Sequence, residues 1–342
     1  MSRTLLTLIF GLIGWCGLSQ DIQYSQYYSN PLYLNPAFTG AIQNHRVAVN
    51  HRLQWPNLPK AFANYSFSYD FNAASLNSGF GILVNVDRAG SANLKNTSAA
   101  FNYSYSVNFE DRWVVKPAVS FGYVTRNIDY EKLVFGDQID FGIPGAPTQD
   151  PSVTAIKNND FFEVGSGLLV YNRRFWGGIS AYHINQPNNS LIQGPGYLPM
   201  KLTAHAGMRF EMGNKAFKDI KKASVAPSFI YKIQGEFQQL DVGASFHYAP
   251  VLMGLYYRGI PWANDVNDYA NHDAIILIFG VEFNQMQFGY SFDSNISRLG
   301  SASGGAHEVS LIYLFNIQKD PRKVERSKRF LPCPAFSDQL FN

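Results

Sequence analysis

The chain has 342 residues, of which 15% are charged and 15% are aromatic, and its formal net charge is +3. Water-soluble proteins usually contain about 25% charged residues, so this composition argues against an ordinary soluble domain. The small net charge gives no indication of nucleic-acid binding. Beyond the N-terminus, no apolar run approaches the roughly 20 residues that a transmembrane helix needs.

Residues 1–19 have the features of a secretory signal peptide. Arg3 supplies a positive charge, residues 5–15 form an apolar run, and the small residues Gly17 and Ser19 precede the predicted cleavage. The mature chain is therefore expected to begin directly after Ser19.

A lipoprotein signal acylated at Cys16 is the alternative, but Trp15 stands where such signals need a small residue. Cleavage after residue 19 leaves Cys333 as the only cysteine. The mature chain can then form no intrachain disulfide, although an export signal indicates an oxidising compartment.

Apolar and polar residues alternate strictly in several parts of the chain, for example in residues 63–71, 101–109 and 286–293. A period of two indicates β-strands, because successive side chains point to opposite faces. The apolar positions are rich in Phe and Tyr, and the polar positions carry Asn, Ser, Gly and Gln. A soluble β-sandwich would carry Lys and Glu on its water-facing side. The pattern therefore predicts a transmembrane β-barrel with an apolar wall and a crowded polar interior.

The pattern predicts an all-β fold, an antiparallel barrel of about fourteen strands. An even number of strands closes a bacterial outer-membrane barrel with both ends of the chain in the periplasm. The predicted strands are 46–55, 61–71, 79–87, 96–109, 112–125, 161–171, 174–184, 200–212, 223–234, 238–249, 251–259, 272–283, 285–293 and 306–316.

The connections between these strands differ in length according to the side on which they are expected. Counted from a periplasmic N-terminus, the outer joints include 127–160, 185–200 and 259–271 and are mostly long. The inner joints include 110–111 and 172–173 and are mostly tight. Long outer loops and short periplasmic turns are typical of these barrels. The loop 127–160 is long enough to be functional, and we expect a surface lid or a partner-binding site there.

The alternation also predicts which side chains face the lumen. In the strand 238–249, Val242 is expected to face lipid, while Asp241 and His247 are expected to face inward. In the strand 272–283, Ile276 and Ile278 interrupt the polar inner face. We therefore expect this part of the lumen to pack against a plug.

Two segments lie outside the predicted barrel, residues 20–45 and residues 317–342. Pro31 and Pro36 remove backbone donors from the first, so it is predicted to be an extended segment rather than a ladder strand. Its apolar residues need a surface to pack against, which the periplasmic mouth or the lumen of the barrel would supply. The Asn-Pro motif either closes the barrel base or docks a periplasmic partner.

The second segment is a basic tail, predicted to lie in the periplasm. It is either a solvated end or a contact for anionic lipid or a partner lipoprotein. Its basic residues are Lys319, Arg322, Lys323, Arg326, Lys328 and Arg329.

Several motifs resemble the PorP/SprF family, outer-membrane barrels of the type IX secretion system of gliding and related bacteria. They are Gln20-Asp21, residues 23–27, residues 30–40 around two Asn-Pro pairs, 52–56, 290–293, 304–311 and the closing Cys333-Pro334 with Phe336.

The resemblance implies a component needed for export or surface presentation of a large adhesin through its C-terminal signal domain. It implies three partners, namely outer-membrane lipid, the C-terminal domain of a secreted adhesin and periplasmic ring components of the secretion system. It also implies that the protein is not an enzyme and lies in the outer membrane with both termini periplasmic.

The candidate residues for partner binding or barrel closing come from these motifs. They are Asn30, Pro31, Leu34, Asn35, Pro36, Arg52, Gln54, Trp55, His307, Glu308, Cys333 and Pro334.

No cofactor, metal or catalytic site is expected. His307 and Glu308 would point to opposite faces of a strand, and the other histidines lack metal-ligand spacing. No serine lies in a nucleophile elbow, which leaves an outer-membrane lipase without support. The remaining alternative function is a porin or a channel for hydrophobic solutes.

Overall fold

The computed structural model describes residues 21–58, 61–90, 93–110, 112–129, 133, 137–138, 148, 157–192, 194–212, 223–264, 270–296, 300–316 and 331–336. The predicted signal peptide, most of the loop 127–160 and the basic residues 319–329 lie outside the described residues. No helix among the described residues is long and apolar enough to cross a membrane.

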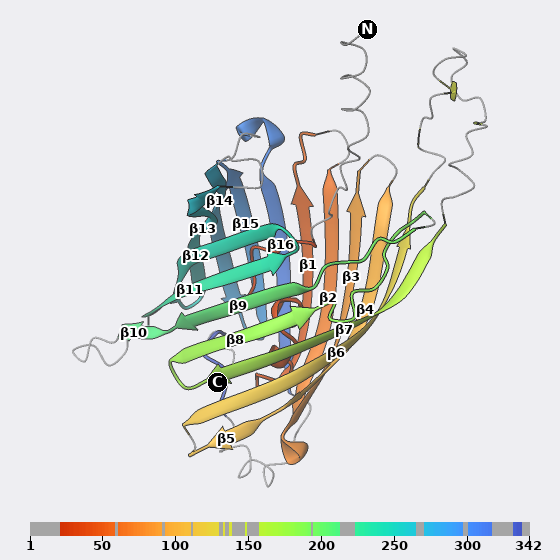
Figure 1. The fold of residues 1–342 in the computed structure, drawn as a ribbon. Coiled ribbons are helices and arrows are strands. Elements are labelled where there is room, and N and C mark those ends of the chain that lie inside the picture. The colour runs from red at the N-terminus through yellow and green to blue at the C-terminus, as the bar shows by residue number, and fades with distance from the viewer. Residues whose placement is uncertain are drawn as a thin grey trace.

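The strands form one closed antiparallel barrel (Figure 1). Strand β16 pairs with β1, and β11 pairs with both β9 and β12, so the sheet has no free edge. The barrel strands are β1 (His45–Gln54), β2 (Phe62–Ala73), β3 (Ser78–Ala89), β4 (Leu94–Tyr105), β6 (Trp113–Asn127), β7 (Asn159–Tyr171), β8 (Phe175–Tyr182), β9 (Lys201–Met208), β11 (Ala223–Gln234), β12 (Phe237–Tyr248), β13 (Val251–Asn264), β14 (Ala270–Phe283), β15 (Met286–Asn295) and β16 (Ala306–Phe315).

Two short strands continue longer ones. β5 (Val107–Phe109) follows β4 and pairs with β6, and β10 (Phe210–Met212) follows β9 and pairs with β11. The wall therefore contains fourteen strands, which confirms the predicted fold class and strand count.

The two ends of the barrel differ in how their strands are joined. We call one end the loop end, because it carries the connections between β6 and β7 and between β8 and β9. The other is the turn end, where β7–β8 and β14–β15 are joined tightly and η2 (Ala74–Leu76) joins β2 to β3. The joint predicted over residues 259–271 is shorter than expected, because β13 runs on to Asn264 and β14 begins at Ala270.

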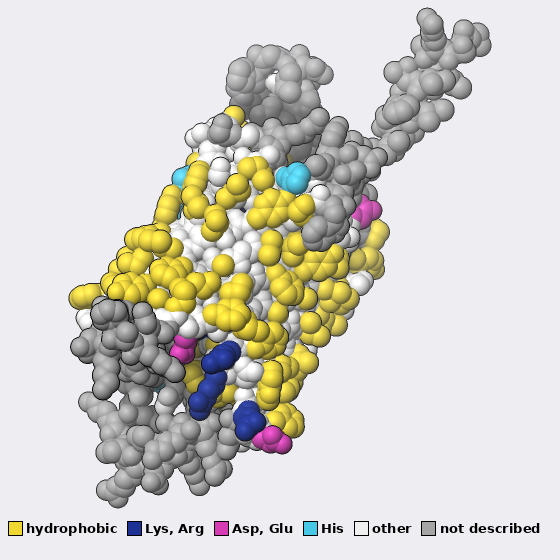
Figure 2. All heavy atoms as spheres, turned by 90° about the vertical axis from the view of Figure 1, so that its left-hand side faces the viewer, with side chains coloured by type: hydrophobic (Ala, Val, Ile, Leu, Met, Phe, Trp, Pro, Cys, Tyr) yellow, Lys and Arg dark blue, Asp and Glu magenta, His cyan; other side chains and the backbone are white. Residues whose placement is uncertain are grey.

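The wall is apolar on its outer side (Figure 2). In β12, Val242 is 44% exposed, whereas Asp241 and His247 are buried, as the alternation predicts. In β14, Ile275 and Leu277 are exposed on the outside, whereas Ile276 is buried. Outward apolar and inward polar side chains are what a lipid-bathed barrel needs.

The lumen is filled by residues 21–44, which we call the plug (Figure 1). Its apolar residues Tyr28, Phe38 and Ile42 belong to one buried cluster that also contains Ile276 and Ile278 of β14. The two isoleucines that interrupt the polar inner face therefore line the part of the lumen that the plug fills, as predicted.

The plug differs from the expected extended segment at two helical turns. α2 (Pro31–Leu34) and η1 (Pro36–Phe38) each begin with the proline of an Asn-Pro pair. Proline is favourable at the first position of a helix, because the N–H that it lacks would have no helical acceptor there. The same prolines that exclude a ladder strand therefore start these turns.

A charge on the outer face tests the membrane-facing register. Leu277→Arg, near the middle of β14, is expected to lower the free energy of unfolding by about 2–4 kcal/mol, because Arg is costly at the bilayer midplane. Phe283→Arg, at the end of the same strand, should cost only about 0–1 kcal/mol. Urea titration of the protein folded in lipid vesicles measures both, and equal losses would contradict the register.

Candidate functional site: the plugged lumen

The plug runs the length of the lumen. Near the loop end, Asp21 contacts Lys201 at the start of β9 and Gln234 at the end of β11. Near the turn end, the Gly40 N–H donates to Asp70 and the Gly40 carbonyl accepts from Lys116. The two ends of the segment are thus held at opposite ends of the barrel.

Ser25 of the plug lies at the centre of a buried ion network. Its Oγ accepts from Arg52 Nη1 at 2.9 Å and from Arg258 Nη2 at 3.0 Å, and donates to Asp293 Oδ2 at 2.7 Å. Its backbone N–H donates to Glu308 Oε2 at 2.8 Å. One residue of the plug thereby joins side chains from β1, β13, β15 and β16.

The charged side chains of this network are two arginines and three carboxylates. Arg52 pairs with Asp293 at 2.7 Å and lies 3.4 Å from Glu308. Arg258 pairs with Asp293 at 3.0 Å and with Asp241 at 2.9 Å. Each of these side chains is almost fully buried. Removal of the plug would take the Ser25 hydroxyl and N–H away from these buried charged groups, and buried polar groups are costly to leave without hydrogen-bond partners, so the network resists separation of plug and wall.

Asn35 fixes the plug to a different part of the wall. Its Nδ2 donates to the carbonyls of Leu168 in β7 and Ile179 in β8 and contacts His205 Nε2 of β9 at 3.1 Å. Its Oδ1 accepts from the Ala37 N–H at the start of η1.

Two glycines of the wall, Gly167 and Gly178, allow the Asn35 side chain to come this close to the strands. A Cβ atom at Gly167 would lie 2.0 Å from Asn35 Oδ1, and one at Gly178 would lie 2.9 Å from Asn35 Nδ2. Leu168 and Ile179 face each other across the β7–β8 ladder, which pairs only Ser166–Tyr171 with Trp176–Ala181. Asn35 therefore bridges the shortest ladder between the described barrel strands.

The turn end is closed by residues 331–336. The Cys333 N–H donates to the Ala41 carbonyl, and Tyr171 Oη donates to the Leu331 carbonyl. The Phe336 ring packs edge-on against Phe38 and lies 4.6 Å from the Arg46 guanidinium carbon. This C-terminal segment thus covers the plug at the turn end of the barrel.

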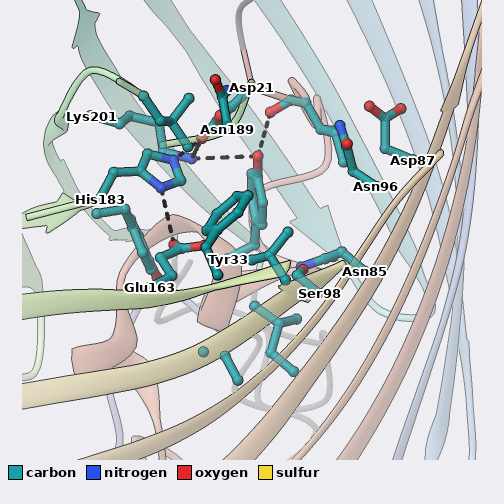
Figure 3. A pocket seen from close by; sticks show the side chains of 18 of the residues that line it. Asp21, Tyr33, Asn85, Asp87, Asn96, Ser98, Glu163, His183, Asn189 and Lys201 are labelled. Carbon is teal, nitrogen blue, oxygen red and sulfur yellow. Dashed lines mark hydrogen bonds and ion pairs between the residues drawn. The ribbon is translucent and has the colours of Figure 1, made fainter. Parts of the chain in front are cut away.

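A polar cavity lies at the loop end, next to the start of the plug (Figure 3). Lys201 Nζ donates to Asp21 Oδ2 at 2.7 Å, and His183 Nε2 lies 2.8 Å from the same oxygen. His183 Nδ1 lies 3.4 Å from Glu163. Burial alone would raise the pKa of Asp21, but Lys201 and His183 hold that pKa well below its usual range. Asp21 is therefore ionised at neutral pH.

The structure brings several of the predicted site residues into these contacts. Leu34 and Pro36 are buried in the plug, and Pro334 is buried beside Cys333. Asn30 is also buried, but neither its amide nitrogen nor its amide oxygen has a hydrogen-bond partner. The two Asn-Pro pairs therefore have different roles, because only the second binds the wall through its asparagine.

Other predicted residues lie in or directly after the strands β1 and β16. Gln54 ends β1, and Trp55 has a φ of 57° and packs edge-on against Phe62. His307 and Glu308 point to opposite faces, as predicted. Glu308 binds the plug, whereas His307 lies 2.8 Å from the exposed Tyr290 hydroxyl.

The candidate residues did not include Ser25, Gln26, Arg258 and Asp293, although the family motifs 23–27 and 290–293 contain three of them. Gln26 donates to Glu308 through its N–H and its side-chain amide. Arg258 and Asp293 occupy inward positions of strands, which is a signal for a role in the lumen. Within the described part of the chain, no group of three or more His, Cys, Asp or Glu side chains is arranged to hold a metal ion.

A family model described as "Type IX secretion system membrane protein PorP/SprF" matches residues 17–313, which is most of the chain. This chain belongs to the PorP/SprF family. The family is one of secretion-system membrane proteins rather than of enzymes, and membership together with a closed lipid-facing barrel indicates the outer membrane.

Solved structures similar to this PorP/SprF protein include a mutant porin of Rh. blastica, with 9% identity, 80% of this chain and 99% of that chain covered, and a TM-score of 0.34. CdiB from Acinetobacter baumannii has 8% identity, the match covers 80% of this chain and 60% of that chain, and the TM-score is 0.44. The CymD monoaromatic hydrocarbon channel has 12% identity, coverage of 88% and 95%, and a TM-score of 0.43. Similarities this weak say nothing about function. No curated protein matches the chain.

Loss of the Asn35 amide tests the bridge across the β7–β8 ladder. Asn35→Ala is expected to lower the free energy of unfolding by about 1–3 kcal/mol, because it leaves buried polar groups without a partner. Asn108→Ala, at an exposed position of β5, should change it by less than about 0.5 kcal/mol. Urea unfolding in lipid vesicles measures both, and similar effects at the two positions would exclude the bridging role.

The thiol of Cys333 provides a test of the closed turn end. Cys333 is fully buried, and this burial raises the pKa of its thiol to about 12. In a chain that lacks residues 1–19, we expect Ellman's reagent to titrate no thiol until the barrel is unfolded, because almost no accessible thiolate is present at neutral pH. Rapid reaction in the folded protein would mean that residues 331–336 leave the mouth.

Proposed function

We propose that this PorP/SprF protein works as a closed outer-membrane component that holds an exported partner, rather than as a pore. It supports export or surface presentation of a large adhesin by binding the adhesin's C-terminal signal domain at the loop end. The observation that carries this proposal is the filled lumen, in which a segment of the same chain is bonded to the wall from end to end.

The contacts of the plug favour holding over conduction. A gate that opens would be held to the wall by few contacts. Here Ser25, Asn35 and Gly40 of the plug bind three separate parts of the wall. Residues 331–336 add a second layer at the turn end. Solute passage would require displacement of the plug, which would break the Asp21–Lys201 pair and the hydrogen bonds of Ser25 to the buried charged side chains.

The proposed orientation places the loop end outside the cell and the turn end in the periplasm, as in other barrels with long outer loops. In this orientation the C-terminal segment 331–336 faces the periplasm, where ring components of the secretion system would contact it. Asp21 lies near the loop end, so the plug enters the lumen from the outer side. The expectation that both termini are periplasmic then applies to the C-terminal segment alone.

The loop end offers apolar side chains to a partner. In the connection between β8 and β9, Ile192 is 60% exposed and Tyr197 is 66% exposed. These residues lie in the connection outside the strands, and the plug does not cover them. Exposed apolar and aromatic side chains on a loop are typical of protein-binding surfaces.

Electrical recording and partner capture together test the proposed function. The full-length protein in planar bilayers is expected to show no steady conductance, whereas a variant lacking residues 21–44 that still inserts should conduct. From cells, tagged full-length protein should retain an adhesin's C-terminal domain, and Ile192→Asp with Tyr197→Asp should reduce its recovery at least about tenfold. The matched control is Leu76→Asp with Phe109→Asp, at exposed positions of the turn end.

A steady large conductance of the full-length protein would favour the alternative porin or hydrophobic-solute channel. Equal loss of the adhesin domain in the loop-end and turn-end variants would also contradict the proposal.

A further inference from the structure

The cavity at the loop end has features that holding the plug does not require. It has a volume of about 120 Å³ and lies between the plug and the inner faces of β3, β4, β6, β7 and β9 (Figure 3). One water needs at least about 10–15 Å³ of such space, so the cavity has room for several waters. This volume suits a small molecule or a single ring of a larger one.

The charged groups facing the cavity compensate one another. Asp21 is bonded to Lys201 and His183, and His183 also faces Glu163. Asp87 accepts a hydrogen bond from Asn64, and Arg126 supplies a positive charge nearby. The cavity therefore has no strong excess of either sign, and it has little to offer a simple cation or anion.

Several polar atoms in the cavity are left without partners among the described residues. The Asn85 side chain is only 6% exposed, yet its Oδ1 has no hydrogen-bond partner. Asn96 Oδ1 is also an unpartnered acceptor, and Arg126 Nε is an unpartnered donor. Buried polar atoms without partners are costly, so a ligand that satisfied all three would gain affinity from their pairing.

The register places these atoms on one continuous inner surface. Asn96 of β4 is paired with Asp87 of β3 on one side and with Arg126 of β6 on the other. Asn85 lies two residues before Asp87, on the same face of β3. Acceptors and a donor therefore lie close together across three neighbouring strands.

We propose that this cavity binds a single sugar ring through Asn85, Asn96 and Arg126. A sugar carries neighbouring hydroxyl groups, each of which donates and accepts, so one ring can serve two acceptors and a donor without bringing a charge. Tyr33 and Phe161 add aromatic surface to the lining. The ring can belong to a free cell-surface polysaccharide or to a glycan on an exported protein, and both share this chemistry.

Binding of methyl glycosides tests the inference. The mature barrel in detergent is titrated with the methyl glycosides of glucose, galactose, mannose and N-acetylglucosamine, and binding is followed by saturation-transfer NMR. At least one glycoside should bind, and Asn85→Ala should weaken its binding about tenfold or more, because a sugar hydroxyl loses its buried acceptor. Asn108→Ala, at the turn end, should leave the affinity unchanged.

A second variant keeps the test valid if Asn85→Ala does not fold. Asn96→Ala changes a less buried position, and the heat-dependent mobility shift of the folded barrel in gel electrophoresis shows whether each variant is intact. Asn96→Ala should weaken the binding of the same glycoside whose binding Asn85→Ala weakens. No binding of any glycoside to the intact wild-type barrel, or preferential binding of arginine or glutamate, would overturn the proposal.

Competition identifies the source of the sugar. Displacement of the methyl glycoside by polysaccharide extracted from the cell surface supports a free polysaccharide, and displacement by glycopeptides from exported proteins supports a protein glycan. This inference does not depend on adhesin binding, because the adhesin domain can be retained by a barrel that binds no glycoside, and the reverse also holds.

Discussion

The structure depends on hydrogen-bond partners for a largely irregular peptide inside a closed barrel. A buried backbone without partners is costly, and the plug pairs only some of its own groups, in α2, η1 and two further turns that end at Ser29 and Ala41. The wall supplies the rest through inward side chains. Ser180, Tyr182, Ser104, Lys116 and Arg46 donate to plug carbonyls at Leu34, Leu32, Thr39, Gly40 and Phe38, respectively. The polar inner face is therefore complementary to one particular peptide.

This complementarity also explains why charged side chains are tolerated in the lumen. Lys116 is fully buried, and its ammonium group donates to the Gly40 carbonyl. Arg46 makes two hydrogen bonds with the Asp70 carboxylate, which in turn accepts from the Gly40 N–H. Gly40 has a φ of 62°, and a Cβ there would lie 2.7 Å from the Gly79 Cα, so only glycine fits. Buried charge and tight backbone approach thus depend on the same few plug residues.

The sequence predicts the elements of this fold far better than their partners. Alternation identifies strands and faces because it is a local property, and the two isoleucines of β14 reveal the plug because they break that alternation. The ion network cannot be predicted in this way, because Ser25 near the start of the chain contacts Asp293 and Glu308 near its end. Those contacts exist only after β16 has paired with β1. Similarly, the two Asn-Pro pairs look equivalent in the sequence, and only the three-dimensional position of Gly167 and Gly178 distinguishes Asn35 from Asn30.

The region around Asn35 shows that plug and wall act as one structural unit. The β7–β8 ladder is short, its inner side is bridged by Asn35, and its lipid-facing side has an apolar hollow lined by Leu168, Ile179 and Leu202. Fewer ladder pairs and a hollowed outer surface leave this part of the described wall weakly supported by the sheet, and the plug bridges it through Asn35. A plug with that role cannot leave the lumen without weakening the barrel.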